Sequence, residues 1–404
     1  MFKSIDKWLP GYLGSILRRP RRPDGVRHLI FCLADHFEPV HWEPDPARRG
    51  PAVRDWLTRY RNWVSGFRDA DGHAPQHTFF YPAEDADPES LTPLAEACRT
   101  GFGEVEIHLH HRNDTGAGLT AKLIAFRDLL HREYGLLGTD PEGRIRYGFV
   151  HGNWALCNSR LDGDWCGVNA ELSILAETGC YADFTFPSAP SPTQPRMVNA
   201  LYLARDRGQR PRGADEGERA EVGQKRGFRV PGSGFRVSSL CSQPSALGLS
   251  SRDSDPCFLS PDSSLLIIQG PLGLNWKRRK WGIVPRIENA ALTGINPPTP
   301  DRVDLWIRQG IHVRGRPEWI FVKVHAHGFD PGSRALFSGG GLVDLHRDLQ
   351  RRYNDGVGWR LHYVTAREMA NLVRAAQAGK EGDPGPWRDW GVKPPYLRGA
   401  APRK

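Results

Sequence analysis

Hydrophobic and polar residues alternate along the chain in a repeated order, a short apolar run followed by a stretch with helical spacing. Eight apolar runs rich in β-branched and aromatic residues have this form, at 28–36, 77–82, 105–111, 147–154, 181–187, 265–271, 320–328 and 360–365. Between runs the apolar residues recur every three or four positions, as Trp56, Tyr60 and Trp63 do, which is typical of one helix face. Strands that alternate with helices predict an α/β fold with a parallel sheet.

The polar residues at the ends of these runs predict how the sheet is arranged. Most runs begin with apolar residues and end in His, Asp, Glu or Asn. Parallel barrels place their sites at the carboxyl ends of the strands, so these side chains would converge on one rim. An open doubly wound sheet would use a glycine-rich phosphate loop, and no G-x-G-x-x-G or G-x-x-x-x-G-K follows any of the runs. We therefore expect a distorted, TIM-like (β/α) barrel of seven to eight strands.

Composition divides the chain into a barrel with three less regular segments. The expected barrel spans 28–380, with an insertion at about 205–264 that is rich in Gly, Ser, Arg and Pro and is expected to be poorly ordered. An extended tail follows at 381–404. The segment 1–27 holds seven Lys or Arg against two Asp, interleaved with apolar residues. It would either lie on an anionic membrane surface or pack on the barrel.

Charge and cysteine content restrict the partners and the compartment. The net charge is +9, but no zinc-finger, RNP or helix-turn-helix pattern accompanies it, so we expect no nucleic-acid role. Seven irregularly spaced cysteines without C-x-x-C argue against a disulfide framework. Without an apolar run of roughly 20 residues or a signal-peptide pattern, we expect a cytoplasmic protein, membrane-associated if the basic segment binds lipid. The oligomeric state is open.

Metal-binding residue types gather at the ends of the first and third runs. In VEIHLHHRND, strand alternation points His108 and His110 to the same side, and Asp114 follows from the next turn. In LADHFE, Asp35, His36 and Glu38 crowd the end of the first strand. We predict a divalent ion, zinc first with cobalt, nickel or manganese as alternatives. Three protein ligands would leave one coordination position for water.

These motifs resemble those of the NodB-type polysaccharide deacetylases. In that family the first strand ends in T-F-D-D, where the first Asp is the catalytic base and the second is a metal ligand. The third strand carries the motif H-[ST]-x-x-H. LADH then places Asp35 as the base and His36 as a ligand, and HHRND places His110 and Asp114 as the other two ligands. FVKVHAHG resembles the late motif whose histidine is the general acid, which implies His325 or His327. The similarity covers four or five short motifs, with the ligand order permuted and the R-x-P-Y segment absent.

The resemblance implies removal of N-acetyl groups from a hexosamine in a saccharide or polysaccharide precursor. His108 would orient a ligand or act as an alternative ligand, as would Glu38. Residues expected to contact the sugar are Tyr81, Trp154 and Trp276 by stacking, Asn153, Gln269 and Asn275 by hydrogen bonds, and Arg286 on an acidic sugar. Two alternatives remain open: a catalytically silent saccharide-binding or assembly barrel, and a glycoside hydrolase that uses Glu38 and Glu106.

Overall fold

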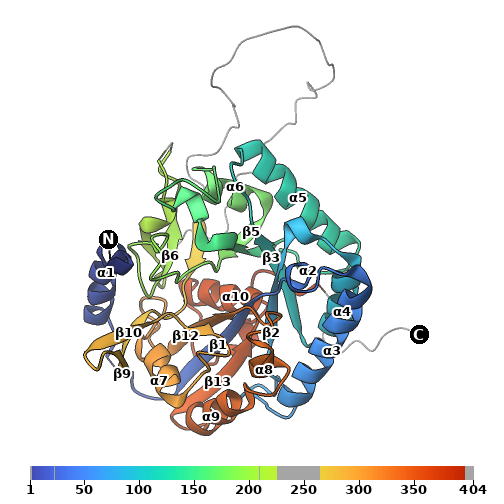
Figure 1. Ribbon diagram of the computed structural model, residues 1–404. Helices are drawn as coiled ribbons and strands as arrows, with labels where there is room; N and C mark the ends of the chain where they lie inside the picture. Colours follow the sequence, from blue (N-terminus) through green and yellow to red (C-terminus); the bar gives the residue numbers. More distant parts are fainter. Residues whose placement is uncertain (1, 22, 209, 225–263, 396–404) are drawn as a thin grey trace, which may run out of the picture.

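A computed structural model describes residues 2–21, 23–208, 210–224 and 264–395. One curled, largely parallel sheet occupies the middle of the molecule, and most helices lie around its outer side (Figure 1). The protein is therefore of the α/β class, as the alternation of strand and helix patterns predicts.

All eight predicted apolar runs form strands of this sheet. Its strands are β1 (Arg27–His36), β2 (His77–Pro82), β3 (Gly103–Leu109), β4 (Tyr147–His151), β5 (Cys180–Asp183), β6 (Leu201–Ala204), β7 (Gly217–Arg219), β8 (Leu265–Ile268), β11 (Ala291–Leu292), β12 (Trp319–Ala326) and β13 (Trp359–Val364). Several observed strands end before the last residues of the predicted runs, so those polar residues start loops. A separate hairpin joins β9 (Gly273–Lys280) to β10 (Val284–Glu288).

The sheet is curled but is not the closed barrel of seven to eight strands that the sequence predicts. Its order runs β11-β12-β1-β2-β3-β4-β5-β8-β6-β7, and β13 pairs with the first half of β1. In a closed barrel, β8 would pair with a strand from the opposite end of the sheet, such as β12. Instead, β8 pairs with the antiparallel strand β6. Lys323 on β12 spans the opening, since its ammonium donates to the carbonyls of Phe184 and Phe186 beyond β5.

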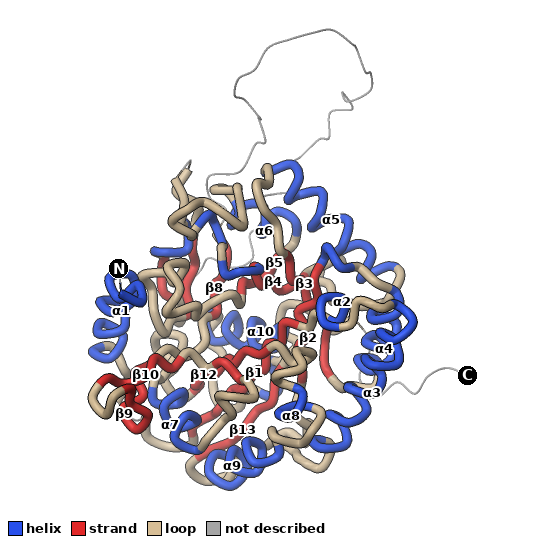
Figure 2. Tube along the Cα trace, in the orientation of Figure 1, coloured by secondary structure: helices blue, strands red, loops and turns tan. Residues whose placement is uncertain are grey.

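Alternate residues of β1 face two different cores. Leu29, Phe31 and Leu33 belong to the outer core, which the surrounding helices cover. Ile30, Cys32 and Ala34 belong to an inner core, enclosed by the curl of the sheet and packed against α10 (Ala366–Gln377). Figure 2 shows α10 in the middle of the ring of strands. Side chains at odd positions of β1 therefore face the outer core, and those at even positions face the inner core. This alternation decides the direction of the polar side chains at the end of the strand.

The remaining helices complete the outer layer. They are α2 (Pro39–Trp42), α3 (Pro46–Val64), α4 (Pro88–Arg99), α5 (Gly116–Arg132), α6 (Glu171–Thr178), α7 (Pro300–Arg308), α8 (Arg334–Phe337) and α9 (Val343–Tyr353). Helices α3, α4 and α7 each begin with a proline that follows an Asp or Thr at the N-cap. Proline has no backbone N–H, and the first N–H of a helix has no partner within the helix, so proline fits at this position. No described helix has the length and apolar content that crossing a membrane requires.

The three irregular segments pack on the sheet to different extents. The basic N-terminal segment forms α1 (Ile5–Leu17), which buries Trp8 and Tyr12 in a small core with Leu272. In the predicted insertion, β7 pairs with β6, so its first part extends the sheet, while residues 209 and 225–263 lie outside the described residues. The start of the tail is anchored by Arg388, which is buried and donates to Asp69.

Candidate metal centre

The carboxyl ends of β1, β3 and β12 bring together a cluster of histidines. His36 ends β1, His108 lies on β3, and Glu38 stands just before α2. One ligand atom from each of these three buried residues lies within 4.8 Å of the other two. The His36 ring also contacts those of His108 and His327, at centroid distances of 4.7 and 4.6 Å. We call His36, Glu38 and His108 the first donor group.

His108 is held in an orientation that suits metal binding. Its Nδ1 lies 2.8 Å from the carbonyl oxygen of Val150, and because a carbonyl only accepts, Nδ1 carries a hydrogen. In the neutral ring Nε2 is then a lone pair, yet it lies 3.2 Å from the carboxylate Oε1 of Glu38. Two acceptors at this distance need a proton or a cation between them. A ligating histidine whose other nitrogen donates to a carbonyl is the common arrangement at metal sites.

The environment favours the protonation states that bind metals. Burial, together with His327 and His108, keeps the pKa of His36 well below its usual range. Burial alone would raise the pKa of Glu38, but the hydrogen bond and positive charge of a protonated His108 outweigh it and lower the pKa to about 2. A metal ion in place of that proton would act in the same direction. A neutral imidazole beside an ionised carboxylate is the form in which both groups ligate.

His110 lies at the more open side of this cluster and is paired with Glu84. Its Nδ1 is 2.5 Å from Glu84 Oε1, and its Nε2 is 3.8 Å from Glu38 Oε1. Burial lowers its pKa, but the bond to Glu84 outweighs that effect and raises it. Gly152 makes room for the ring, since a Cβ there would meet His110 Cδ2 at 2.2 Å. The sequence analysis missed Glu84, although it follows the carboxyl end of the second strand.

Asp35 lies on the opposite face of β1 from His36 and does not join the first donor group. Its carboxylate is fully buried, 2.9 Å from His77 Nε2, and it accepts the backbone N–H of Gly328. The Gly328 carbonyl in turn accepts from the Trp56 indole. Only glycine fits there, because a Cβ would lie 2.3 Å from Asp35 Oδ2. These contacts place the Asp35 carboxylate against the turn that carries His327 and away from the first donor group, so its position does not support the expected role of base.

Asp114 is also absent from the first donor group, contrary to the sequence prediction. The chain turns at Asn113, which has a positive φ of 49°, and Thr115 then caps α5. The Asp114 carboxylate therefore binds Lys122 at 2.7 Å and lies 3.2 Å from His111 Nδ1. The spacing from His110 to Asp114 matches the family motif, but this turn directs the carboxylate toward α5.

Of the two predicted acid histidines, His327 is the more accessible. His325 is buried on β12, its Nδ1 has no hydrogen-bond partner among the described residues, and burial keeps its pKa well below the usual range. His327 is half-buried and its ring contacts His36.

Most residues predicted to bind sugar are not placed for it. Tyr81, Gln269 and Asn275 are buried; Tyr81 donates to the Asp85 carbonyl, Gln269 to the Met197 carbonyl, and Asn275 accepts from the amides of the next turn. Trp276 and Arg286 are exposed on the β9–β10 hairpin. Asn153 and Trp154 are half-buried, both with positive φ, directly after β4. Of this set, Asn153 and Trp154 are the residues that are both partly exposed and just beyond the carboxyl end of a parallel strand on the rim that bears the histidines.

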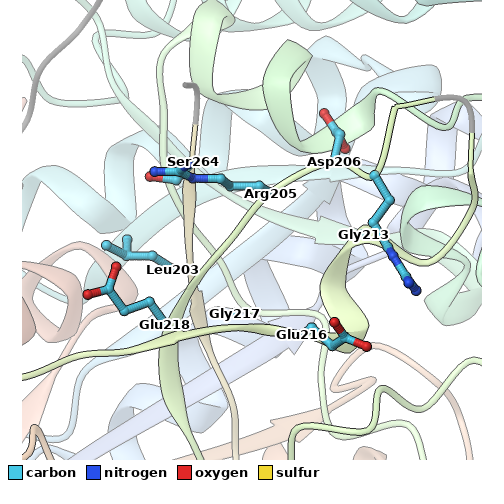
Figure 3. Close-up of a pocket in the computed structure, with 9 residues that line it drawn as sticks. Leu203, Arg205, Asp206, Gly213, Glu216, Gly217, Glu218 and Ser264 are labelled. Carbon is cyan, nitrogen blue, oxygen red and sulfur yellow. The ribbon is translucent and has the colours of Figure 1, made fainter. Parts of the chain in front are cut away.

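Two other polar features do not provide a catalytic arrangement. His28 lies near the amino-terminal end of β1 and His362 in the middle of β13, and the nearby Asp71 is already neutralised by Arg388 at 2.7 Å. A pocket of about 380 Å³ lies beside β6 and β7 (Figure 3). Its residue Asp206 accepts from the backbone amides that begin α6, so that carboxylate has a structural role.

The chain matches no protein-family model, and none of the curated protein sequences matches it. Function must therefore be argued from the residues of the first donor group and their surroundings.

Proposed function

We propose that the protein is a metal-dependent hydrolase that acts on carbohydrate and removes N-acetyl groups from a hexosamine-containing saccharide or polysaccharide precursor. Two things support this. Imidazole and carboxylate ligands converge at the carboxyl ends of parallel strands, on a curled sheet that is compatible with a strongly distorted, open variant of the NodB-type barrel. The sequence motifs that resemble that family also place histidines there.

His36, Glu38 and His108 would hold the ion, which we take to be zinc, with cobalt, nickel or manganese as alternatives. A divalent ion bound at such a site polarises an amide carbonyl and lowers the pKa of water from about 15.7 toward about 7. Relative to the sequence prediction, His36 remains a ligand, and Glu38 and His108 replace His110 and Asp114.

His110 is suited to accept a proton during the reaction. Glu84 orients its ring and raises its pKa, as a carboxylate does for a general-base histidine. Its side chain is 31% exposed, with Nε2 lying 3.8 Å from Glu38 Oε1, so a water or substrate could reach the ring.

His327 is suited to give a proton to the departing amine. Its ring packs against His36, and the turn that carries it is held by Asp35 and Trp56 through Gly328. Two histidines that flank the ligands could thus divide the proton transfers.

The observation that carries the proposal is the pairing of His108 Nε2 with Glu38 Oε1. The Val150 carbonyl fixes one proton of His108 on the far nitrogen, so the short contact between the near nitrogen and the carboxylate requires a second proton or a cation between them. A buried histidine with a purely structural role would normally use its second nitrogen as a donor.

Metal analysis of purified variants tests the proposal. His36→Ala and His108→Ala should each lose one equivalent of divalent ion after zinc supplementation, whereas His131→Ala, a histidine on α5, should keep it. The wild-type protein should release acetate from N-acetylhexosamine oligomers and His110→Ala should lose at least about 10²-fold in rate. Metal content that is the same in wild-type, His36→Ala and His108→Ala proteins would refute the metal centre. New reducing ends without acetate would instead indicate a glycosidase, and bound metal with neither product a silent barrel.

A further inference from the structure

A second group of metal-binding side chains lies beyond the ends of β3 and β4, and the proposed function does not use it. It consists of His111, His151, Cys166 and Glu171, all of them buried, with one ligand atom of each within 4.8 Å of the others. His151 ends β4, Glu171 begins α6, and Cys166 comes from the loop between them. We call these residues the second donor group.

The separations in this group match those of ligands around one small ion. Glu171 Oε1 lies 3.2 Å from His111 Nε2 and 3.4 Å from His151 Nε2, and Glu171 Oε2 lies 3.4 Å from Cys166 Sγ. Tetrahedral zinc has ligand distances of about 2.0–2.3 Å, which place neighbouring ligands roughly 3.3–3.8 Å apart. The two nitrogens and the sulfur therefore surround Glu171 at coordination spacing.

The nitrogen of each ring that faces away from Glu171 has an oxygen close to it, as ligating histidines require. His151 Nδ1 is 2.5 Å from the carbonyl oxygen of Gly152, so it carries the hydrogen, and the Nε2 lone pair faces a carboxylate without a hydrogen-bond partner among the described residues. His111 Nδ1 lies 3.2 Å from Asp114 Oδ2, although the angle is not that of a hydrogen bond. A carboxylate or carbonyl behind each ring is the usual support for a bound imidazole.

We infer that His111, His151, Cys166 and Glu171 form a second, closed metal site of the structural zinc type. Four protein ligands with no exposed side chain leave no position for substrate, unlike the first donor group. Binding would release the thiol proton of Cys166 to solvent, move the ring proton of His111 from Nε2 to Nδ1 beside Asp114, and place the cation where the His151 lone pair faces the carboxylate. Asp114, predicted from the sequence as a ligand, would orient one instead.

The site would fix a loop that the chain alone holds poorly. Between β4 and α6, the non-glycine residues Asn153, Trp154, Cys157, Asn158 and Trp165 all have positive φ, a conformation that costs free energy at each position. An ion that joins both strand ends to the loop and to α6 would compensate for that strain. Because this loop directly follows β4, the second site would hold the rim beside the first.

Cobalt spectroscopy separates the two sites, because the first donor group contains no sulfur. Full-length protein loaded with Co²⁺ should bind two equivalents and show a thiolate-to-cobalt charge-transfer band in the near ultraviolet. Cys166→Ser should lose the band, whereas Cys180→Ser, a buried cysteine on β5, and His36→Ala should keep it. His36→Ala should still bind one equivalent, so failure of the first site would not hide the second.

The wild-type spectrum can overturn the inference even if a variant does not fold. A wild-type protein that binds cobalt without a charge-transfer band, or a band that persists in Cys166→Ser, would exclude Cys166 as a ligand. His151→Gln offers an independent check: it should lower cobalt stoichiometry from two to one and lower the thermal midpoint of the metal-loaded protein more than that of the chelator-treated protein.

The β9–β10 hairpin carries a separate surface with the chemistry of a membrane contact. Lys277, Arg278, Arg279 and Lys280 run in sequence along the end of β9. Trp281 and Ile283 form the turn and are 72% and 73% exposed. Trp281 also has a positive φ of 54°, which a bulky residue rarely adopts, and the Lys280 ammonium lies 4.3 Å from the centroid of its exposed ring.

We propose that this hairpin binds an anionic lipid surface. Its basic residues would attract the headgroups, and its apolar turn would enter the interface, which is the arrangement of monotopic anchors. Helix α1, which belongs to the basic N-terminal segment, lies on the same side of the molecule (Figure 1) and packs against the hairpin, with the Leu274 amide donating to the Tyr12 hydroxyl. Exposed Trp and Ile favour lipid over nucleic acid, since a polyanion gains nothing from apolar insertion.

Vesicle co-sedimentation tests the surface. The protein should bind phosphatidylcholine vesicles that contain phosphatidylserine, bind pure phosphatidylcholine weakly, and lose binding at high salt. Trp281→Ser with Ile283→Ser should weaken binding at least about tenfold, whereas Val357→Ser, an equally exposed residue before β13, should not. No binding to anionic vesicles, or a turn-dependent dimer in light scattering, would overturn the proposal. Binding to RNA that the double variant retains, with vesicle binding equal in both proteins, would do so as well.

Discussion

Glu106 provides the sharpest test of how the inner face of the sheet is organised. It lies on β3, fully enclosed, with Tyr181 donating to one carboxylate oxygen and the Gly148 amide close to the other. Arg367, whose charge lowers the pKa of Glu106, is already bound by Glu104 through three hydrogen bonds. Burial therefore dominates and raises the pKa of Glu106 to about 8. At neutral pH most of the protein should hold this carboxyl in its protonated form.

The effect of Glu106 on stability follows from the difference between its pKa values in the unfolded and folded chain. In the unfolded chain Glu106 ionises near pH 4.5, and in the folded chain near pH 8. Between these values the folded state binds the extra proton, so its stabilising contribution is complete below pH 4.5 and is lost as pH rises through 8, at roughly 1.4 kcal/mol per pH unit. Glu106→Gln, whose amide matches the protonated carboxyl, lacks this titration. From pH 6 to pH 8 the variant should gain about 2 kcal/mol relative to wild type.

Urea unfolding of both proteins at pH 6, 7 and 8 measures this difference. Glu381→Gln, at an exposed position, should follow the wild type at each pH. If the Glu106→Gln and wild-type free energies stay parallel across this range, or the variant loses stability at pH 8, then the carboxyl is ionised and paired and the argument fails. The variant should also retain hydrolase activity, because Glu106 contacts Tyr181 and the β4 backbone rather than the first donor group. Loss of activity would instead support the glycosidase hypothesis, in which Glu106 is one of the two acidic residues.

Two further variants examine the positions around β1 and β12. Asp35→Asn should keep its metal and lose less than about tenfold in rate, because a positioning residue is disturbed, whereas removal of a general base would cost about 10²–10⁴-fold; steady-state kinetics with metal analysis decide. Arg302→Met should destabilise the protein by about 3–5 kcal/mol in chemical unfolding, because it leaves the buried Glu288 carboxylate without its cation. The double variant with Glu288→Met should recover much of that loss, and a double variant as unstable as the single one would contradict the reasoning.

The strands could be predicted from the sequence because each is a short apolar run with clear ends. The missed strands give a weaker signal: β6 is an apolar run of only four residues, β7 is a three-residue polar segment, and β9 ends in four consecutive cations that resemble a loop. Barrel closure could not be predicted either. Whether β8 pairs with β12 or with β6 depends on contacts between distant segments, and the local pattern of β8 is the same in both cases.

The candidate site was predictable where strand alternation decides it. Alternation places His36 and His108 on inner-face positions, and both lie in the first donor group. Matching the chain to a family motif by spacing assigned Asp114 to the metal, but a positive φ at Asn113 directs that carboxylate elsewhere. Glu84 and His77 belong to neither motif, and each acquires a partner only because β2 lies beside β1 and β3 in the folded sheet.

Adjacent residues in this protein serve different sites, and the alternation of the strands explains the division. Asp35 points outward to His77, while His36 points inward to the first donor group. Directly after β3, His110 contacts Glu84, while the next residue, His111, contacts Glu171. A one-residue shift in either strand would exchange these partners and leave buried charges without their counterparts, at a cost of several kcal/mol each. The same carboxylate–imidazole pairs that position the proposed catalytic groups therefore also oppose misregistered folding of β1 and β3.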